Sequence, residues 1–190
     1  MNNTPRTAPR SELPANFVAI DFETADRSSD SACAVALVRV EGLEIVRREF
    51  CLLRPPRPNF EFSYLHGITW AAVADKPTFG EAWPELSRIL EGADALVAHN
   101  APFDRDVLMT CCRAARLPPT PLPFKCTVQL ARSTWGIFPT KLPNVCAYLG
   151  IPLKHHDPVS DAEACARIMI EARRGRPRNK LDARRARRLT

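Results

Sequence analysis

The sequence of 190 residues contains only 7 glycines and no hydrophobic run long enough to cross a membrane. The scarcity of glycine excludes collagen-like fibres. Its apolar runs, such as Phe17–Ile20, fall far short of the roughly 20 residues that a membrane-spanning helix needs. We therefore expect neither an integral membrane protein nor a membrane partner.

No two cysteines have the CxxC spacing, and the seven cysteines are odd in number. Most lie within apolar stretches, where cysteine behaves as a small hydrophobic residue. Residues 1–16 lack the apolar segment of a secretory signal. These absences argue against a disulfide scaffold and a thiolate zinc site, and they predict a cytoplasmic location.

Positive charge is concentrated at one end of the chain. The formal net charge is +6, but residues 173–190 carry +8 and the remaining 172 residues carry −2. We expect a disordered, proline-rich lead-in over 1–15, a folded domain over 16–173 and a basic, disordered tail over 174–190. Such a tail is either a solvated segment or a sequence-independent, salt-sensitive contact to phosphates.

Hydrophobic periodicity separates strands from helices along the folded domain. The pattern predicts strands over 17–21, 32–40, 43–53, 95–98 and 124–126. It predicts helices over 78–90, 102–117, 128–135, 143–149 and 159–173. Three consecutive strands followed by alternating helices and strands indicate an α/β fold with a central, mixed, five-stranded sheet flanked by helices.

Acidic side chains lie where a folded core is expected. Asp21 and Glu23 alternate in a strand and therefore point to the same face. Asp104 and Asp161 each begin an apolar helical stripe. Buried carboxylates cost several kcal/mol each unless a cation compensates them. All-oxygen ligation favours Mg²⁺ or Mn²⁺ over zinc, and His156 lies five residues before Asp161, within reach as a general base.

These acids fall in motifs that resemble those of the DEDDh (DnaQ-like) 3′→5′ exonucleases. The motifs are Asp-Phe-Glu-Thr at 21–24, His-Asn-Ala-Pro-Phe-Asp at 99–104 and His-Asp-Pro-Val-Ser-Asp at 156–161, with His-Gly-Ile-Thr at 66–69. The similarity spans residues 16–173 and is greatest to proofreading-type members such as the DNA polymerase III epsilon subunit. It implies a ribonuclease H-like fold, two divalent metal ions and release of nucleoside 5′-monophosphates.

The resemblance also implies roles for single residues. Asp21 would bridge both metals, Glu23 and Asp161 would complete the metal that holds the attacking water, and Asp104 would support the second metal. His156 would accept the proton of that water. Both ions would be Mg²⁺, with Mn²⁺ able to substitute.

Further residues would surround the terminal nucleotide. The resemblance assigns substrate binding to Thr24, Ala25, His66, Ile68, Asn100 and Phe103. Asn100 is expected either to orient its loop or to cap the following helix. At position 25 a second threonine often stands in the family, so the Ala25 contact differs here. We interpret His155 as a surface histidine and His99 as a structural one.

The expected substrate is a single-stranded or frayed 3′ end, with DNA favoured over RNA. The alternatives are an exoribonuclease similar to oligoribonuclease or RNase T, and a catalytically inactive nucleic-acid-binding module. Gln129 is the only glutamine and lies inside the domain, so a glutamine-led clamp-binding peptide is absent. The sequence supports no polymerase or clamp association and predicts no oligomeric state.

Overall fold

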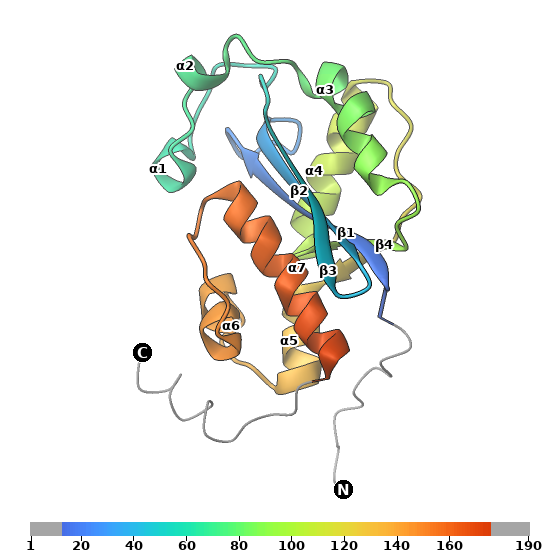
Figure 1. Ribbon diagram of the computed structural model, residues 1–190. Coiled ribbons are helices and arrows are strands. Elements are labelled where there is room, and N and C mark those ends of the chain that lie inside the picture. Colours follow the sequence, from blue (N-terminus) through green and yellow to red (C-terminus); the bar gives the residue numbers. More distant parts are fainter. Residues whose placement is uncertain (1–12, 176–190) are drawn as a thin grey trace, which may run out of the picture.

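The computed structural model describes residues 13–175 and contains a mixed, five-stranded sheet (Figure 1). The strands are β1 (Asn16–Thr24), β2 (Ala32–Glu41), β3 (Glu44–Leu52), β4 (Ala95–Ala98) and β5 (Phe124–Cys126), in the order β3-β2-β1-β4-β5. The first three strands pair antiparallel, whereas β1, β4 and β5 pair parallel. The predicted α/β fold with a mixed, five-stranded sheet is confirmed.

Helices cover both faces of this sheet (Figure 1). They are α1 (Ser63–His66), α2 (Trp70–Val73), α3 (Phe79–Leu86), α4 (Ala101–Ala114), α5 (Thr127–Trp135), α6 (Leu142–Leu149) and α7 (Pro158–Arg174), with a 3₁₀ turn at Ser87–Leu90. One core joins α5, α6 and α7 to the sheet, and a second core joins α3 and α4 to its other face. No helix in residues 13–175 is long and apolar enough to span a membrane.

β1 lies between the two cores, and its side chains alternate between them. Phe17 and Ala19 contribute to the core under α7, whereas Val18 and Ile20 contribute to the core under α4. By this alternation, Asp21 and Glu23 continue the α7 side of the strand. Burial of the strand on both faces thus brings two acids to the end of a rigid, apolar element.

Several element boundaries differ from the sequence prediction. The helix expected over 78–90 accommodates Pro84 and changes to a 3₁₀ turn after Leu86. The helix expected over 102–117 ends at Ala114, and Arg116 adopts a left-handed φ of 57°. Helices α1 and α2 were not predicted, since four residues are too few to show a periodicity.

The chain ends bear on the predicted domain limits. Leu13, expected in the lead-in, packs against the core under α7, which itself extends to Arg174. Residues 1–12 and 176–190, including nearly all of the basic tail, lie outside the described residues. All seven cysteines are free thiols in this structure.

Candidate active site

Asp104 reaches the end of β1 from the first turn of α4. Its side chain is only 2% exposed, and its Oδ1 accepts a hydrogen bond from the backbone N–H of Phe22 at 3.0 Å. The helix starts there because Pro102 occupies its first turn and Asn100 precedes it with a left-handed φ of 65°. The side chain of Asn100 makes no capping hydrogen bond, so of its two expected roles the geometry supports the shaping of the loop.

Asp161 reaches the same place from the first turn of α7. Asp157 caps this helix by accepting a hydrogen bond from the N–H of Ser160 at 3.1 Å. The Asp161 Oδ2 accepts a hydrogen bond from the backbone N–H of His156 at 3.1 Å. Its Oδ1 is buried and has no hydrogen-bond partner in the described chain. A buried carboxylate oxygen without a partner fits a site built for a cation.

The two adjacent histidines, both exposed, lie beside Asp161. Nδ1 of His155 lies 3.0 Å from Oδ2 of Asp161, so the side chain interpreted as a surface histidine contacts the site, although it is exposed. The ring of His156 stacks on that of His155 with centroids 3.9 Å apart. His156 also has a left-handed φ of 67°. The pair of rings therefore covers the carboxylate of Asp161 from the solvent side.

Burial raises the pKa of all four acids, and neighbouring acids raise the pKa of Asp21, Glu23 and Asp104 further. Burial raises the pKa of Asp21 well above its usual range, and Asp104, Glu23 and Asp161 raise it further. Burial raises the pKa of Glu23 to about 7 and that of Asp104 to about 8. Burial also raises the pKa of Asp161, although its contacts with the two histidines oppose this effect.

No lysine or arginine of residues 13–175 forms an ion pair with any of these four acids. Their mutual repulsion is therefore relieved only by protons or by added cations. Oxygen donors of this kind match the preference of Mg²⁺ and Mn²⁺. The donor set fits the divalent ions that exonucleases of this kind generally use.

His66 is held against the end of β1. Its Nε2 donates to the carbonyl oxygen of Thr24 at 3.2 Å, and its Nδ1 accepts from the N–H of Ile68 at 3.1 Å. These two bonds define a neutral ring, and burial lowers the pKa of His66. Thr24 is buried, and Ala25 is fully buried. The N–H of Ala25 donates to the carbonyl of Ser31, and its carbonyl accepts from Glu61 and Phe62, so Ala25 presents no exposed group to a substrate in this structure.

Arg57, which the sequence analysis missed, ties the connection after β3 to the end of β1. This connection carries His66, and we call it the His66 segment. Nε of Arg57 donates to Asp26 Oδ2 at 2.7 Å, and its Nη2 donates to Asp30 Oδ1 at 2.6 Å. This contact lowers the pKa of Asp26 to about 2. The N–H of Glu61 donates to the carbonyl of Ala25 at 2.7 Å. A single arginine in a proline-rich connection carries no sequence signal of such a role.

The remaining residues of the predicted site occupy the start of α4. Phe103 is 44% exposed beside Asp104. His99 uses both ring nitrogens, with Nδ1 2.8 Å from Thr127 Oγ1 and Nε2 donating to the carbonyl of Thr140 at 2.9 Å. These contacts agree with the structural role expected of His99.

A family model described as exonuclease, RNase T, matches residues 18–169. The chain belongs to this exonuclease family. The predicted resemblance and the enzyme class that it implies, a hydrolytic nuclease, are thereby confirmed. The chain is 31% identical over 160 residues to the PolC-type DNA polymerase III of Thermotoga maritima, which covers 82% of this chain and 12% of the polymerase.

Exodeoxyribonuclease 10 of Escherichia coli is 34% identical over 146 residues, covering 72% of this chain and 60% of that enzyme. The chain thus spans about an eighth of the PolC-type relative and 60% of this one. The solved structure of exonuclease X with 5′ overhanging duplex DNA matches with a TM-score of 0.66 and 29% identity, covering 84% of this chain and 93% of that one. An exonuclease I structure, at 15% identity and a TM-score of 0.69, covers 83% and 41% of the two chains and shows the fold alone.

Proposed function

We propose that this exonuclease-family domain is a divalent-metal-dependent 3′→5′ exonuclease that releases nucleoside 5′-monophosphates. One observation carries the proposal. Three separate elements, β1, α4 and α7, bring four acids to one place, where burial raises the pKa of all four and neighbouring acids raise that of Asp21, Glu23 and Asp104 further. Buried acids without counter-ions destabilise a fold, so such a cluster is expected at a cation-binding site rather than as a stabilising feature.

Asp21, Glu23, Asp104 and Asp161 would hold two divalent ions, which supply charge neutralisation at the scissile phosphate and at the leaving oxygen. In the reaction a water oxygen bonds to phosphorus, and the bond between phosphorus and the 3′-oxygen of the preceding nucleotide breaks. The electron pair of that bond remains on the 3′-oxygen, which takes up a proton from solvent. The freed terminal nucleotide keeps its 5′-phosphate.

His156 would accept the proton of the attacking water. Its N–H bond to Asp161 fixes its backbone beside the acids, and its ring is exposed at the surface of the site. A neutral imidazole is suited to this role because its usual pKa is close to neutral pH. His155, in contact with Asp161, would hold that carboxylate in position.

The proposed substrate is a single-stranded or frayed DNA 3′ end. The names of two relatives support DNA, namely exodeoxyribonuclease 10 and the exonuclease X structure with duplex DNA. His66, Ile68 and Phe103, together with Asn100 and Thr24, would bind the terminal nucleotide, and Ala25 would support Thr24 from beneath the surface. A cytoplasmic location is part of this proposal, since the free thiols suit a reducing compartment.

An RNA-directed exonuclease is the second candidate. The observation in its favour is a solved 3′-exonuclease, bound to a histone mRNA stem-loop, that matches the fold with a TM-score of 0.69 and 18% identity. Rates on DNA and RNA oligonucleotides of the same sequence separate the two, because only RNA carries the 2′-hydroxyl. We expect the DNA oligonucleotide to be degraded faster. Faster degradation of the RNA oligonucleotide would reverse the assignment of the substrate.

The proposed activity is tested on a 5′-labelled single strand with Mg²⁺ or Mn²⁺. We expect a ladder of shortened, labelled products, with mononucleotide 5′-phosphates in solution. EDTA should stop the reaction and excess Mg²⁺ should restore it. Asp161→Ala should remove the ladder while the protein keeps its circular dichroism spectrum. Full activity of this variant, or binding without any turnover in the wild type, would refute the proposal.

A further inference from the structure

A hollow of about 520 Å³ extends from the candidate catalytic acids toward the start of α6. Asp21 and Asp161 line one part of it. Arg132 of α5 and Lys141, the residue that precedes α6, line another part. We call this space the α5–α6 hollow. One part of the hollow thus borders the candidate catalytic acids, and another part borders two positively charged side chains.

The two cations of the α5–α6 hollow have no acidic partner. Arg132 Nη2 donates to Thr140 Oγ1 at 3.1 Å, and in residues 13–175 neither Arg132 nor Lys141 forms an ion pair. Both side chains are exposed. Two like charges that share one hollow repel each other, so an anion placed between them is stabilised by both.

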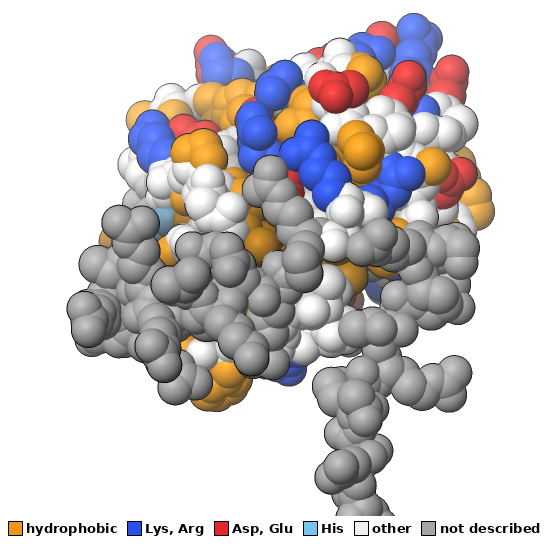
Figure 2. Space-filling model, turned by 60° about the horizontal axis from the view of Figure 1, so that its bottom comes forward, with side chains coloured by type: hydrophobic (Ala, Val, Ile, Leu, Met, Phe, Trp, Pro, Cys, Tyr) orange, Lys and Arg blue, Asp and Glu red, His pale blue; other side chains and the backbone are white. Residues whose placement is uncertain are grey.

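Two arginines of another hollow are neutralised within the chain. Arg48 and Arg167 line a separate hollow beside β3 and α7, and both bind Glu163, at 2.7 and 2.5 Å. On the face seen from below, Asp and Glu side chains likewise lie among Lys and Arg side chains (Figure 2). The α5–α6 hollow differs from the hollow beside β3 and α7 because its two cations have no acid paired with them in the described part of the chain.

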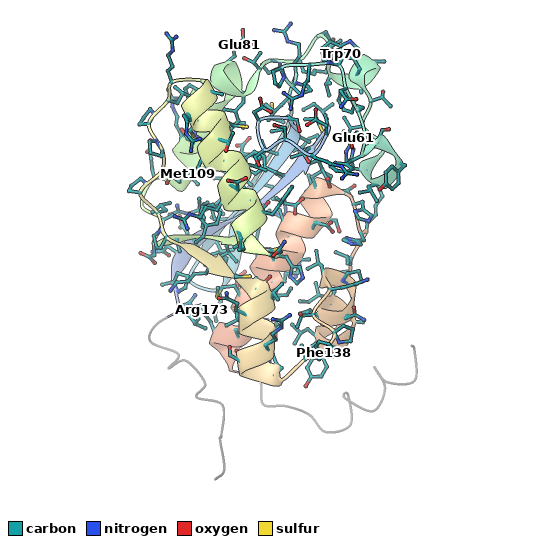
Figure 3. The ribbon with its side chains drawn as sticks, turned by 180° about the vertical axis from the view of Figure 1, so that it is seen from behind. Glu61, Trp70, Glu81, Met109, Phe138 and Arg173 are labelled. Carbon is teal, nitrogen blue, oxygen red and sulfur yellow. The ribbon has the colours of Figure 1, made fainter. Side chains whose placement is uncertain are left out.

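The α5–α6 hollow leads away from the His66 segment. Its lining includes Asp21 but neither Glu23 nor Thr24, the residues of β1 that lie nearer to His66. In Figure 1, α1 and α2 lie on one side of the start of α7, and α6 lies on the other. Figure 3 shows the corresponding separation of Glu61 and Trp70 from Phe138. The α5–α6 hollow is therefore available to a strand whose terminal nucleotide lies beside His66.

An exposed aromatic ring borders the α5–α6 hollow. Phe138 lines it and is 85% exposed, and its side chain stands out from the connection between α5 and α6 (Figure 3). Aromatic rings next to basic side chains are the common means by which proteins hold single strands, because every base offers a face for stacking.

We propose that the α5–α6 hollow binds the substrate strand on the 5′ side of the scissile bond. Arg132 and Lys141 bind its backbone phosphates, and Phe138 stacks on a base. This assignment rests on the proposed exonuclease function, and it makes the enzyme select strands over mononucleotide esters. Because the contacts are to phosphates and to base faces, they are independent of sequence and sensitive to salt.

The test compares two substrates of the double variant Arg132→Gln/Lys141→Gln. One is a ten-nucleotide oligothymidylate, and the other is the 4-nitrophenyl ester of thymidine 5′-phosphate, which has a scissile bond but no upstream phosphate. We expect the ratio of kcat/KM on the oligonucleotide to kcat/KM on the ester to fall about tenfold, a typical cost of losing charged contacts to a strand. Arg54→Gln, which removes an exposed arginine outside the hollow, is the matched control and should leave this ratio unchanged.

Binding provides a second measurement that does not depend on turnover. By fluorescence anisotropy in EDTA, the double variant should bind the labelled oligonucleotide more weakly, with a salt slope smaller by about 1.4 for the two lost phosphate contacts. Arg132→Lys/Lys141→Arg should restore most of the affinity, and Phe138→Ala should weaken binding about fivefold. Equal affinity and equal salt slope in the wild type and the double variant would overturn the proposal. Failure of the wild type to cleave either substrate would instead refute the exonuclease function, and binding would still decide the role of the hollow.

Discussion

Two groups of carboxylates lie a few residues apart at the end of β1, in opposite surroundings. Asp26 and Asp30 share Arg57, which lowers the pKa of both. Asp21 and Glu23 have no basic partner in residues 13–175, and burial raises the pKa of both. The same residue type thus serves as a structural anion in one group and as an uncompensated charge in the other.

The two groups of carboxylates therefore serve different purposes, one in stability and the other in function, although they lie close together in the chain. The group around Arg57 holds the connection after β3 against the end of β1, and that connection carries His66 into the site. The group around Asp21 opposes folding unless a cation binds. The first group should therefore respond to mutation mainly through stability, and the second mainly through activity.

The largest expected effect is the loss of activity when the uncompensated group is altered. Asp21→Asn keeps the size of the side chain but removes a charge that faces three other acids. We expect nuclease activity to fall by at least about 1000-fold, equivalent to about 4 kcal/mol in the barrier. Asp75→Asn, at an exposed position, is the control. Turnover of Asp21→Asn within tenfold of the wild type would place the chemistry elsewhere.

The second effect concerns the compensated group. Arg57→Gln removes the partner of Asp26, whose side chain is only 5% exposed. We expect the free energy of unfolding in urea to fall by about 2 kcal/mol, because a largely buried charge loses its counter-ion. The KM should rise more than kcat falls, since the His66 segment becomes less well held. Unchanged stability would show that the contact contributes nothing.

Acid pH tests the same contact without changing Arg57. The pKa of Asp26 is lowered to about 2, so the contact stabilises the protein above the usual pKa of about 3.9 and is lost as the pH falls toward 2. Between pH 4 and pH 2.5 we expect the wild type to lose about 1 kcal/mol more than Asp26→Asn. Parallel pH profiles of unfolding in urea would contradict this account.

The smallest expected effect has the opposite sign. Asp104→Asn keeps an oxygen to accept the bond from Phe22 and relieves the repulsion among the acids. In EDTA we expect this variant to be about 1 kcal/mol more stable than the wild type, although it is less active. Asp106→Asn, on the same helix but exposed, is the matched control. A variant less stable than the wild type in EDTA would show that the acids do not strain the fold.

The sequence indicated candidate site residues most clearly where an acidic residue occupies a position that the apolar periodicity assigns to the core. Asp104 and Asp161 stood out because apolar stripes follow them, and the structure buries both. The mixed sheet was predictable because β1, β2 and β4 are apolar, buried strands bounded by turns. The family motifs predicted that the four acids form one site. The periodicity predicted only the face of the strand or helix on which each acid lies.

Features that depend on contacts between distant segments were not predictable. Arg57 meets Asp26 and Asp30 from 31 and 27 residues away in the chain, and no local pattern encodes that distance. His155 contacts Asp161 through the local turn of the chain before α7, which residue spacing does not define. Arg132 and Lys141 line one hollow only because α5 and α6 meet there.

Direct measurement of Mn²⁺ binding tests the central claim, that the uncompensated acids form a metal site and the compensated ones do not. Free Mn²⁺ is followed by electron paramagnetic resonance during titration into the wild type, Asp21→Asn and Asp26→Asn at neutral pH. The account predicts that the wild type and Asp26→Asn bind Mn²⁺ alike, whereas Asp21→Asn binds it at least tenfold more weakly, about 1.4 kcal/mol or more. Equal binding by Asp21→Asn and the wild type would contradict it.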